Sequence, residues 1–206
     1  MQQRRGLLIV LEGIDGSGKT TQARSLLGRL RRRGWPAAFF REPSRGRWGR
    51  EIRRLAARDG SLTPEGELDL FLKDRRENVA RNLEPALARG RTVVLDRYYF
   101  STIAYQGAKG LDPGRIRRLN EAFAVRPDLV VVLDIGARDG LARISGRKRR
   151  DELFEREDYL ARVREIFRAL RGPYIVHLDG SADRRAVGRA IWERVEPLLA
   201  KIRTKT

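Results

Sequence analysis

The stretch Gly13-Ile14-Asp15-Gly16-Ser17-Gly18-Lys19-Thr20 decides the fold of this chain of 206 residues. It matches the pattern of glycine, four residues and Gly-Lys-Thr, in which backbone N–H groups surround a chain of phosphates. A short apolar run at 6–11 precedes it, and Thr20 to Arg33 follows with apolar residues at helical spacing. Strand, glycine loop and helix are the order that this chemistry requires. The sequence therefore predicts a loop that holds the phosphates of a nucleotide.

Three kinds of residue in this loop have separate parts. Gly13, Gly16 and Gly18 let the backbone approach the phosphates because they carry no side chain. The amino group of Lys19 reaches the terminal phosphates, and the hydroxyl of Thr20 is a ligand for Mg²⁺. The N-terminus of the following helix adds partial positive charge.

Length and composition limit the fold and its chemistry. A chain of 206 residues is long enough for a substantial core, and we expect 1–206 to form one domain. No apolar stretch approaches the roughly 20 residues that span a membrane, and Met1 to Arg5 leads straight into the first strand without a signal peptide. Cysteine is absent, which excludes disulfides and thiolate sites and fits the cytoplasm. The single histidine, His177, is interpreted as a structural strand residue.

The formal net charge of +18 has three explanations. A basic surface attracts nucleic acid, so a nucleotide-dependent nucleic-acid-binding protein is one candidate. A kinase for nucleotides also needs arginines around its phosphates. Because 39 arginines stand against six lysines, spread along the whole chain, compositional bias is the third explanation. Clustered basic tracts are absent except at 147–150, so specific nucleic-acid binding is not favoured.

The rest of the chain alternates short apolar strands with helical patterns. Further strands are predicted at 37–40, 92–95, 129–133 and 174–178, and helices at 20–33, 50–58, 63–88, 99–106, 112–124, 157–170 and 183–202. This alternation predicts a three-layer α/β fold, a five-stranded parallel sheet with helices on both faces. Ligands of such folds bind at the carboxyl ends of strands, which carry the glycine loop, Arg41, Asp96 and Asp134.

Asp96 directly follows four apolar strand residues and precedes Arg97. A carboxylate in this place holds Mg²⁺, directly or through water, in many proteins with a phosphate loop. The alternative is an ordinary helix cap at the end of a strand. The loop upstream favours the metal site, so Thr20 and Asp96 are the predicted metal ligands.

Four groups of residues, in order along the chain, carry a resemblance to one family. They are Glu12 to Thr20, Arg41-Glu42-Pro43, Leu70-Phe71 with Asp74-Arg75, and Asp96 to Gly107. Together they resemble the thymidylate kinases; the last group is specific, and the glycine loop alone marks only the P-loop superfamily of nucleoside monophosphate kinases. The resemblance implies transfer of a phosphoryl group from ATP to thymidine monophosphate (dTMP) with Mg²⁺. It also implies a homodimer and a mobile lid, at about 138–156.

Matched residue by residue, the resemblance implies a role for each part of the site. ATP would bind to the loop and the first helical turn: Gly13, Ile14, Asp15, Gly16, Ser17, Gly18, Lys19, Thr20 and Thr21. The acceptor would bind to Asp15 through its 3′-hydroxyl, to Arg41 and Arg97 through its phosphate, and to Phe71, Arg75, Ser101, Thr102, Tyr105 and Gln106 through its base and sugar. The residues implied to be catalytic are Lys19, Arg97 and two lid arginines, Arg143 and Arg149.

The chemistry of the pocket residues agrees with these implied roles. Phe71 would pack on the planar base, and Arg75 would donate to its O4. Tyr105 would pack on the sugar and exclude a 2′-hydroxyl. Core packing for Phe71 and a solvated helix face for Arg75 remain the alternatives. Neighbouring Tyr98 and Tyr99 are interpreted as core residues.

The chain departs from the family pattern around the acceptor pocket. Ser44 to Trp48 stands where Gly-Gly-Thr is usual, Lys73 where a small residue is common, and Asn78 where histidine is common. A related deoxynucleoside monophosphate kinase with altered base specificity is therefore the alternative within the enzyme class. Arg45 and Arg47 either contact the acceptor phosphate or belong to a solvated basic loop.

Gly16 carries information about the lid. Members with arginine after the loop aspartate place a catalytic arginine there, whereas the bacterial type, which this chain resembles, supplies it from the lid. The expected segment contains Arg143, Arg147, Arg149 and Arg150. The usual Asp-Arg-x-Glu of the lid is replaced by residues 152–155, so the register assigns none of the four. We favour Arg143 and Arg149.

Overall fold

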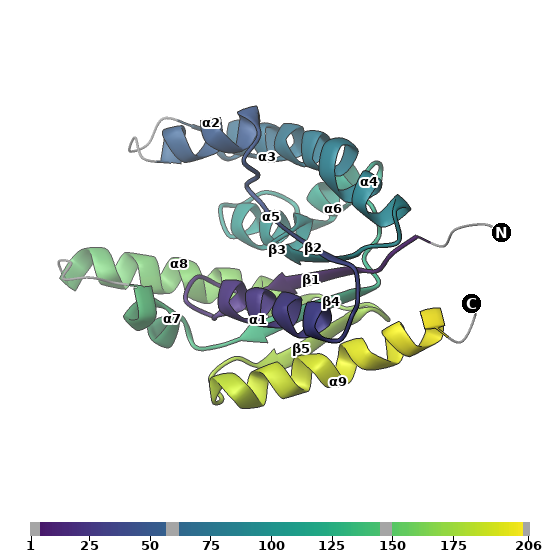
Figure 1. Ribbon diagram of the computed structural model, residues 1–206. Coiled ribbons are helices and arrows are strands. Elements are labelled where there is room, and N and C mark those ends of the chain that lie inside the picture. Colours follow the sequence, from purple (N-terminus) through teal and green to yellow (C-terminus); the bar gives the residue numbers. More distant parts are fainter. Residues whose placement is uncertain (1–4, 57–61, 145–149, 204–206) are drawn as a thin grey trace.

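The computed structural model describes residues 5–56, 62–144 and 150–203. In this part of the chain the centre is a sheet of five parallel strands in the order β2-β3-β1-β4-β5. The strands are β1 (Leu8–Glu12), β2 (Ala37–Arg41), β3 (Thr92–Asp96), β4 (Leu129–Asp134) and β5 (Ile175–Asp179). Helices cover both faces of the sheet (Figure 1), so the predicted fold class is confirmed.

The helices divide between the two faces of the sheet. α1 (Lys19–Arg32) and α9 (Arg184–Arg203) contact each other on one face, and α5 (Tyr99–Gly107) and α8 (Arg150–Ala169) contact each other on the other (Figure 1). The remaining helices are α2 (Arg47–Ala56), α3 (Pro64–Asn78), α4 (Glu84–Ala88), α6 (Pro113–Glu121) and α7 (Ala137–Ile144). Among the described residues, none of the helices combines the length and the apolar character that crossing a membrane requires.

The central strand β1 shows why the sheet needs two helical layers. Leu8 and Val10 belong to the core beneath α5 and α8, whereas Ile9 and Leu11 belong to the core beneath α1 and α9. All four side chains are fully buried. Since successive side chains of a strand point to opposite faces, a continuous apolar run is buried on both sides. The last residue of this strand is a buried glutamate, Glu12.

The long helix predicted at 63–88 is interrupted by a wide π-helical turn, Val79–Leu83, between α3 and α4. The N–H of Glu84 bonds to the carbonyl of Val79, five residues earlier. Pro85 follows, which has no N–H and would collide with a carbonyl four residues earlier in a regular helix. The wide turn accommodates this proline, and it lies next to Asn78, which faces the site.

The segment predicted as a lid, 138–156, contains α7 and the start of α8. α8 begins at Arg150, seven residues before the predicted start of that helix at 157, so the boundary was wrong. Arg147 and Arg149 lie outside the described residues. Of the favoured lid arginines, only Arg143 has a described position, at the end of α7.

Three aromatic interpretations are confirmed. Tyr98 and Tyr99 are buried, and the Tyr99 ring stacks on Phe100 with centroids 4.1 Å apart. His177 lies in β5, where its Nε2 is 3.0 Å from the carbonyl oxygen of Leu170. Tyr98 and Tyr99 thus belong to the core, whereas His177 is an exposed residue of its strand.

Candidate active site

The glycine loop connects β1 to α1 at the carboxyl end of the sheet. Gly13, Gly16 and Gly18 have φ angles of 137°, 80° and 85°, a region that favours glycine. The side chain of Lys19 lies within the loop and donates a 2.9 Å hydrogen bond to the carbonyl of Ile14. Its amino group is thus held inside the ring of backbone groups that would surround phosphates.

Thr20 and Asp96 meet where α1 faces the end of β3. The Thr20 hydroxyl donates to Asp96 Oδ2 over 2.6 Å, and Arg41 Nε lies 3.5 Å from the same oxygen. Asp96 Oδ1 is buried without a hydrogen-bond partner in the described structure. A hydroxyl and a carboxylate are hard oxygen ligands, and the unpartnered oxygen leaves one position free for a cation. The two predicted metal ligands therefore fit Mg²⁺ as a pair.

Within the described residues, no cluster of three or more histidine, cysteine, aspartate or glutamate side chains could hold a metal ion. A cation at Thr20 and Asp96 would therefore take its remaining oxygens from phosphates and water, which is the usual arrangement for Mg²⁺ bound with a nucleotide.

Asp15, Arg97 and Tyr105 form one hydrogen-bonded group beside the loop. Arg97 Nη2 donates to Asp15 Oδ1 over 2.5 Å, and the Tyr105 hydroxyl donates to Asp15 Oδ2 over 3.0 Å. The backbone N–H of Asp15 donates to the Tyr105 oxygen over 3.1 Å. The Arg97 guanidinium also lies 5.2 Å from the centroid of the Tyr105 ring. The structure thus brings Asp15 together with two residues that lie more than 80 positions later in the sequence.

The charges of this group shift one another's pKa values. Burial, and after it the nearby Arg97, lower the pKa of Lys19 from 10.5 to about 7, although Asp15, Asp96 and Glu12 act in the opposite direction. Burial opposes ionisation of Asp15, but Arg97 and Lys19 outweigh it and hold the Asp15 pKa below its ordinary value. The site therefore contains a carboxylate that stays ionised beside the Arg97 guanidinium, and an amino group whose pKa lies near neutral pH.

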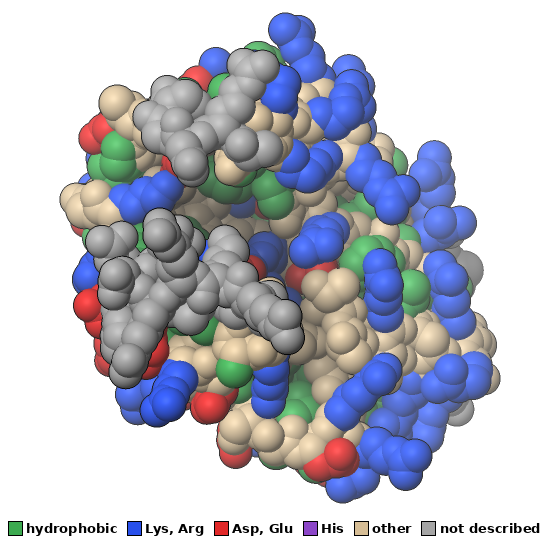
Figure 2. All heavy atoms as spheres, turned by 90° about the vertical axis from the view of Figure 1, so that its left-hand side faces the viewer, with side chains coloured by type: hydrophobic (Ala, Val, Ile, Leu, Met, Phe, Trp, Pro, Cys, Tyr) green, Lys and Arg blue, Asp and Glu red, His purple; other side chains and the backbone are tan. Residues whose placement is uncertain are grey.

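Beside this group opens a pocket of about 550 Å³. It lies at the carboxyl ends of the strands, where Figure 2 shows a hollow bordered by basic side chains. Its walls combine aromatic, apolar and hydrogen-bonding side chains, a composition typical of small-molecule sites. They include six predicted acceptor residues, Phe71, Arg75, Ser101, Thr102, Tyr105 and Gln106, together with Asp15 and Arg97.

Arg75 is fully buried at the wall of this pocket, so the solvated alternative for this residue was wrong. Its Nε donates to Glu42 over 2.8 Å, Nη1 to Asn120 over 2.5 Å and Nη2 to Thr102 over 3.1 Å. Glu42 is also buried, and Asn78 donates to its other oxygen over 3.1 Å. These partners fix the plane of the guanidinium against the pocket.

Phe71 lines the same pocket. It is partly exposed to the pocket and does not belong to the buried core clusters. This placement supports a contact with a ligand rather than core packing.

Gln106 contributes an unpaired acceptor. Its Nε2 donates to Glu67 over 2.9 Å, whereas its Oε1 is buried without a hydrogen-bond partner in the described structure. Glu67 also accepts from Lys109 over 2.5 Å, which fixes its carboxylate. The pocket therefore offers a free carbonyl oxygen to a ligand N–H group.

Two residues of the site were missed in the sequence. Tyr159 of α8 lines the pocket and donates to the carbonyl of Tyr105 over 3.0 Å. Glu12 lies under the loop and accepts hydrogen bonds from Tyr98 and Ser101. Tyr159 could not be predicted, because it reaches the pocket only through the packing of α8 on α5. Glu12 could have been predicted, because a glutamate at the end of an otherwise apolar strand must be buried and therefore needs partners.

The sequence is similar to known proteins of one family. A family model described as "Thymidylate kinase" matches residues 11–191. A thymidylate kinase of Akkermansia muciniphila is 47% identical over 189 residues, 92% of this chain and 91% of the relative. Thymidylate kinases of Xanthomonas campestris and Xanthomonas oryzae are 48% and 46% identical over 184 residues, 89% of this chain and 80% of each relative. This chain belongs to the thymidylate kinase family.

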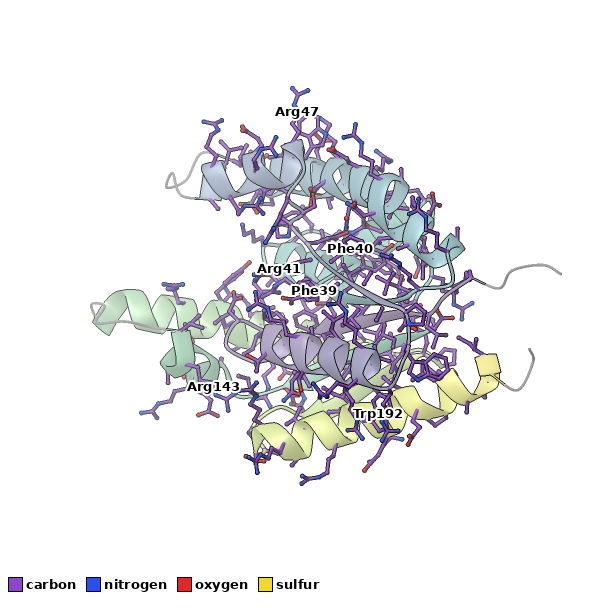
Figure 3. All side chains as sticks on the ribbon, viewed as in Figure 1. Phe39, Phe40, Arg41, Arg47, Arg143 and Trp192 are labelled. Carbon is purple, nitrogen blue, oxygen red and sulfur yellow. The ribbon has the colours of Figure 1, made fainter. Side chains whose placement is uncertain are left out.

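Several departures from the usual thymidylate kinase pattern lie away from the pocket. Lys73 Nζ lies 5.1 Å from the centroid of the Trp48 ring and 2.6 Å from Asp69, and neither Lys73 nor Trp48 lines the pocket. Arg45 and Arg47 are exposed and also lie outside the pocket lining. Arg47 projects outward from α2 in Figure 3. The structure thus favours the solvated loop for both arginines over contacts with an acceptor phosphate.

Ser44 and Asn78, the other departures, have internal partners. The Ser44 N–H and hydroxyl donate to the two oxygens of buried Asp74, over 2.7 and 2.6 Å. Asn78 bonds Glu42, as described above. These residues hold the segment after β2 against α3.

Arg143, at the end of α7, approaches the glycine loop. Its Nη1 lies 3.3 Å from the carbonyl oxygen of Gly16 and 3.4 Å from that of Gly180. Arg143 and Arg41 lie at the same end of the sheet (Figure 3). In contrast, Asp134 is held in a two-bond pair with Arg164, at 2.5 and 3.0 Å, and is a structural residue here.

Gly16 and Gly140 bring the loop and α7 into direct backbone contact. A Cβ atom on Gly16 would lie 2.1 Å from the carbonyl oxygen of Gly140, and one on Gly140 would lie 2.5 Å from that of Asp15. An arginine at position 16 would therefore collide with α7. This contact explains sterically why a catalytic arginine has no room in this loop.

Gly16→Ala should lower turnover by about 100-fold, because the loop and α7 must separate by roughly an ångström to admit the methyl group. Gly34→Ala is the matched control. Gly34 has a similar φ of 77°, but its Cβ would meet nothing within 4 Å. It should lose about 1 kcal/mol of stability and keep its turnover. Steady-state rates and denaturant titrations of both variants test this, and equal turnover in the two would contradict it.

Glu12 adds a pH dependence to stability. Burial raises its pKa from 4.5 to about 7, against the lowering effects of Ser101, Arg97, Tyr98 and Lys19. Because the folded-state pKa is the higher one, the stabilisation from the protonated form is complete below pH 4.5 and is lost as pH rises to about 7. At about 1.4 kcal/mol per unit, the loss is on the order of 3 kcal/mol.

Glu12→Gln should abolish this dependence, because glutamine does not titrate. Urea unfolding at about pH 4.5 and about pH 8 would give the difference in free energy of unfolding between wild type and variant. From the lower to the higher pH, the free energy of unfolding of the variant should rise by roughly 3 kcal/mol relative to that of wild type. A difference that is the same at both pH values would show that Glu12 does not titrate in this range.

Proposed function

We propose that this chain is a phosphotransferase that moves the γ-phosphoryl group of ATP to dTMP, giving ADP and dTDP. Membership of the thymidylate kinase family supports the reaction. The observation that carries the proposal for this chain is that Asp15 of the glycine loop also lines the acceptor pocket, where the Arg97 guanidinium bonds to it. A donor phosphate in the loop and an acceptor phosphate in the pocket would thus meet at one guanidinium.

The pocket suits a thymine base. Phe71 offers an aromatic face, the fixed guanidinium of Arg75 a donor for the O4 carbonyl, and Gln106 an unpaired oxygen for the N3–H group. Ser101 and Thr102 complete the polar edge. Cytosine carries an amino group at position 4 and no N3–H. Its amino group would face the donors of Arg75, and its N3 would face the acceptor oxygen of Gln106, so neither pair would form a hydrogen bond.

The sugar would bind between Asp15 and Tyr105. The Asp15 carboxylate would accept a hydrogen bond from the 3′-hydroxyl. Tyr105 is held on Asp15 by its own hydroxyl, so its ring occupies the space beside the sugar. A 2′-hydroxyl would meet this ring, which favours deoxynucleotides.

Phosphoryl transfer needs positioning and neutralisation of charge. An oxygen of the dTMP phosphate forms the new bond to the γ-phosphorus of ATP, and the bond from that phosphorus to the β,γ-bridging oxygen breaks. In this proposal Lys19 binds the β- and γ-phosphates, Arg41 and Arg97 bind the acceptor phosphate, and Arg143 stabilises the transferring group from the lid. Mg²⁺ held through Thr20 and Asp96 would neutralise phosphate charge when bound.

The proposal includes a homodimer acting in the cytoplasm. The homodimer is carried over from the family resemblance, and the cytoplasm fits a sequence without cysteine. The alternative with altered base specificity loses most of its basis, because Lys73 and Trp48 pack on each other outside the pocket. The nucleic-acid-binding alternative is based on the charge of +18.

An acceptor panel tests the function. With ATP and Mg²⁺, dTMP should give a kcat/KM at least about 100-fold above dCMP and dGMP, because a site built to pair a substrate N–H and carbonyl rejects analogues that lack them. Equal rates with dTMP and dCMP would favour the altered-specificity kinase.

Lys19→Ala is the control for catalysis in this panel and should remove nearly all ADP formation with the fold kept. A nucleic-acid-binding protein would instead show salt-sensitive DNA binding that survives Lys19→Ala, with no acceptor phosphorylated. That outcome would reject the kinase.

Arg143→Ala should lower kcat by about 100-fold or more and change the KM values for ATP and dTMP little, as expected for a residue that acts on the transition state. Arg138→Ala is the matched control, an exposed arginine on the same helix, and should leave both constants unchanged. If the two variants behave alike, the catalytic arginine is not Arg143.

A further inference from the structure

Glu12 is a buried carboxylate for which the phosphate-loop pattern gives no role. It is the last residue of β1, directly before the loop, and it is fully buried. A buried carboxylate costs free energy unless hydrogen bonds and charges compensate it. The residues that compensate Glu12 therefore indicate what it is for.

The described hydrogen bonds of its side chain go to the start of α5. Glu12 Oε1 accepts from the backbone N–H of Tyr98 over 2.7 Å and of Ser101 over 3.2 Å. Glu12 Oε2 accepts from the Ser101 hydroxyl over 2.5 Å. The residue at the N-cap position of α5, Tyr98, makes no side-chain cap bond of its own. Glu12 thus caps α5 from a neighbouring strand, satisfying N–H groups that the helix leaves free.

The capped segment begins directly after Arg97, whose backbone is unusual. Arg97 is the non-glycine residue in the described chain with a positive φ, at 70°. Such a conformation persists only where its surroundings impose it. The N–H groups on either side of the bend are fixed on β1: that of Arg97 on the Leu11 carbonyl at 3.0 Å, and that of Tyr98 on Glu12.

Glu12 also reaches the Arg97 side chain through one intermediate. The Ser101 hydroxyl, which donates to Glu12, accepts from Arg97 Nη1 over 2.9 Å. The other terminal nitrogen, Nη2, bonds Asp15. One carboxylate therefore constrains both the backbone and the guanidinium of Arg97.

We infer that Glu12 is a positioning residue for the acceptor phosphate: it holds Arg97 in its left-handed conformation and aims its guanidinium at the junction of loop and pocket. It acts through the geometry of its hydrogen bonds to residues 98 and 101. The inference rests on the proposed function for the identity of the acceptor, but the conformation of Arg97 does not depend on it.

Three variants and a control separate this role from a merely structural one. Glu12→Ala removes the bonds to α5. Glu12→Gln keeps an oxygen for the two N–H groups and an amide that donates to the Ser101 hydroxyl. Glu12→Asp keeps the charge on a shorter side chain. Val10→Ala, at a fully buried position two residues earlier on the same strand, lowers stability without touching Arg97.

Steady-state kinetics with dTMP and ATP give the first result. Glu12→Ala should raise the KM for dTMP by about tenfold or more and keep the KM for ATP within about twofold. Glu12→Gln should lie within about threefold of wild type in both, with Glu12→Asp between the two. Val10→Ala should keep both KM values despite a lower melting temperature. Equal rises in both KM values, or no rescue by glutamine, would overturn the inference.

Crystal structures of the variants without nucleotide give a second, independent result. Arg97 should keep its φ near 70° in Glu12→Gln and Val10→Ala and leave it in Glu12→Ala. An unchanged Arg97 in Glu12→Ala would reject the inference, whatever the acceptor is. Wild type that fails to phosphorylate dTMP would reject the proposed function alone, since the conformation of Arg97 is measured without substrate.

Discussion

The hydrogen-bonded position of the Arg97 guanidinium is the constraint on which the rest of the site depends. It lies between the glycine loop and the pocket and is bonded to Asp15 and Ser101. A planar group with fixed partners on two sides keeps one orientation, which a flexible lysine would not. The price of this order is a left-handed backbone at Arg97 and a buried carboxylate at Glu12. Strain and buried charge thus occur together where the two substrates would meet.

The sheet explains why these residues could be found partly from the sequence. Parallel strands end at one edge, so residues that follow apolar runs must meet there. This reasoning placed the glycine loop, Arg41 and Asp96 correctly at one edge, and the structure joins Thr20 to Asp96 directly. The apolar runs and their helical connections were likewise enough for the fold class. Such rules work because they depend on chain direction and periodicity alone.

Features that depend on packing between helices could not be predicted from local patterns in the sequence. Arg75 lies in a charged run that looks solvated, yet α3 turns it inward onto Glu42 and Asn120. Tyr159 reaches the pocket only because α8 packs on α5. The sequence around each of these residues does not indicate its partner, because each partner comes from a distant element. The family resemblance did indicate Arg75, because a family motif reflects a shared structure in which this packing has already taken place.

The departures from the family pattern follow the same principle of paired contacts. Ser44 bonds Asp74, Trp48 packs against Lys73, and Asn78 bonds Glu42. Trp48 and Lys73 both depart from the pattern and contact each other, whereas Ser44 and Asn78 bond to residues that match it. Interaction energies couple such neighbours and not distant sites. The Arg75 guanidinium, whose partners are Glu42, Asn120 and Thr102, keeps its orientation behind these changes. An unusual sequence around the pocket is therefore compatible with ordinary recognition inside it.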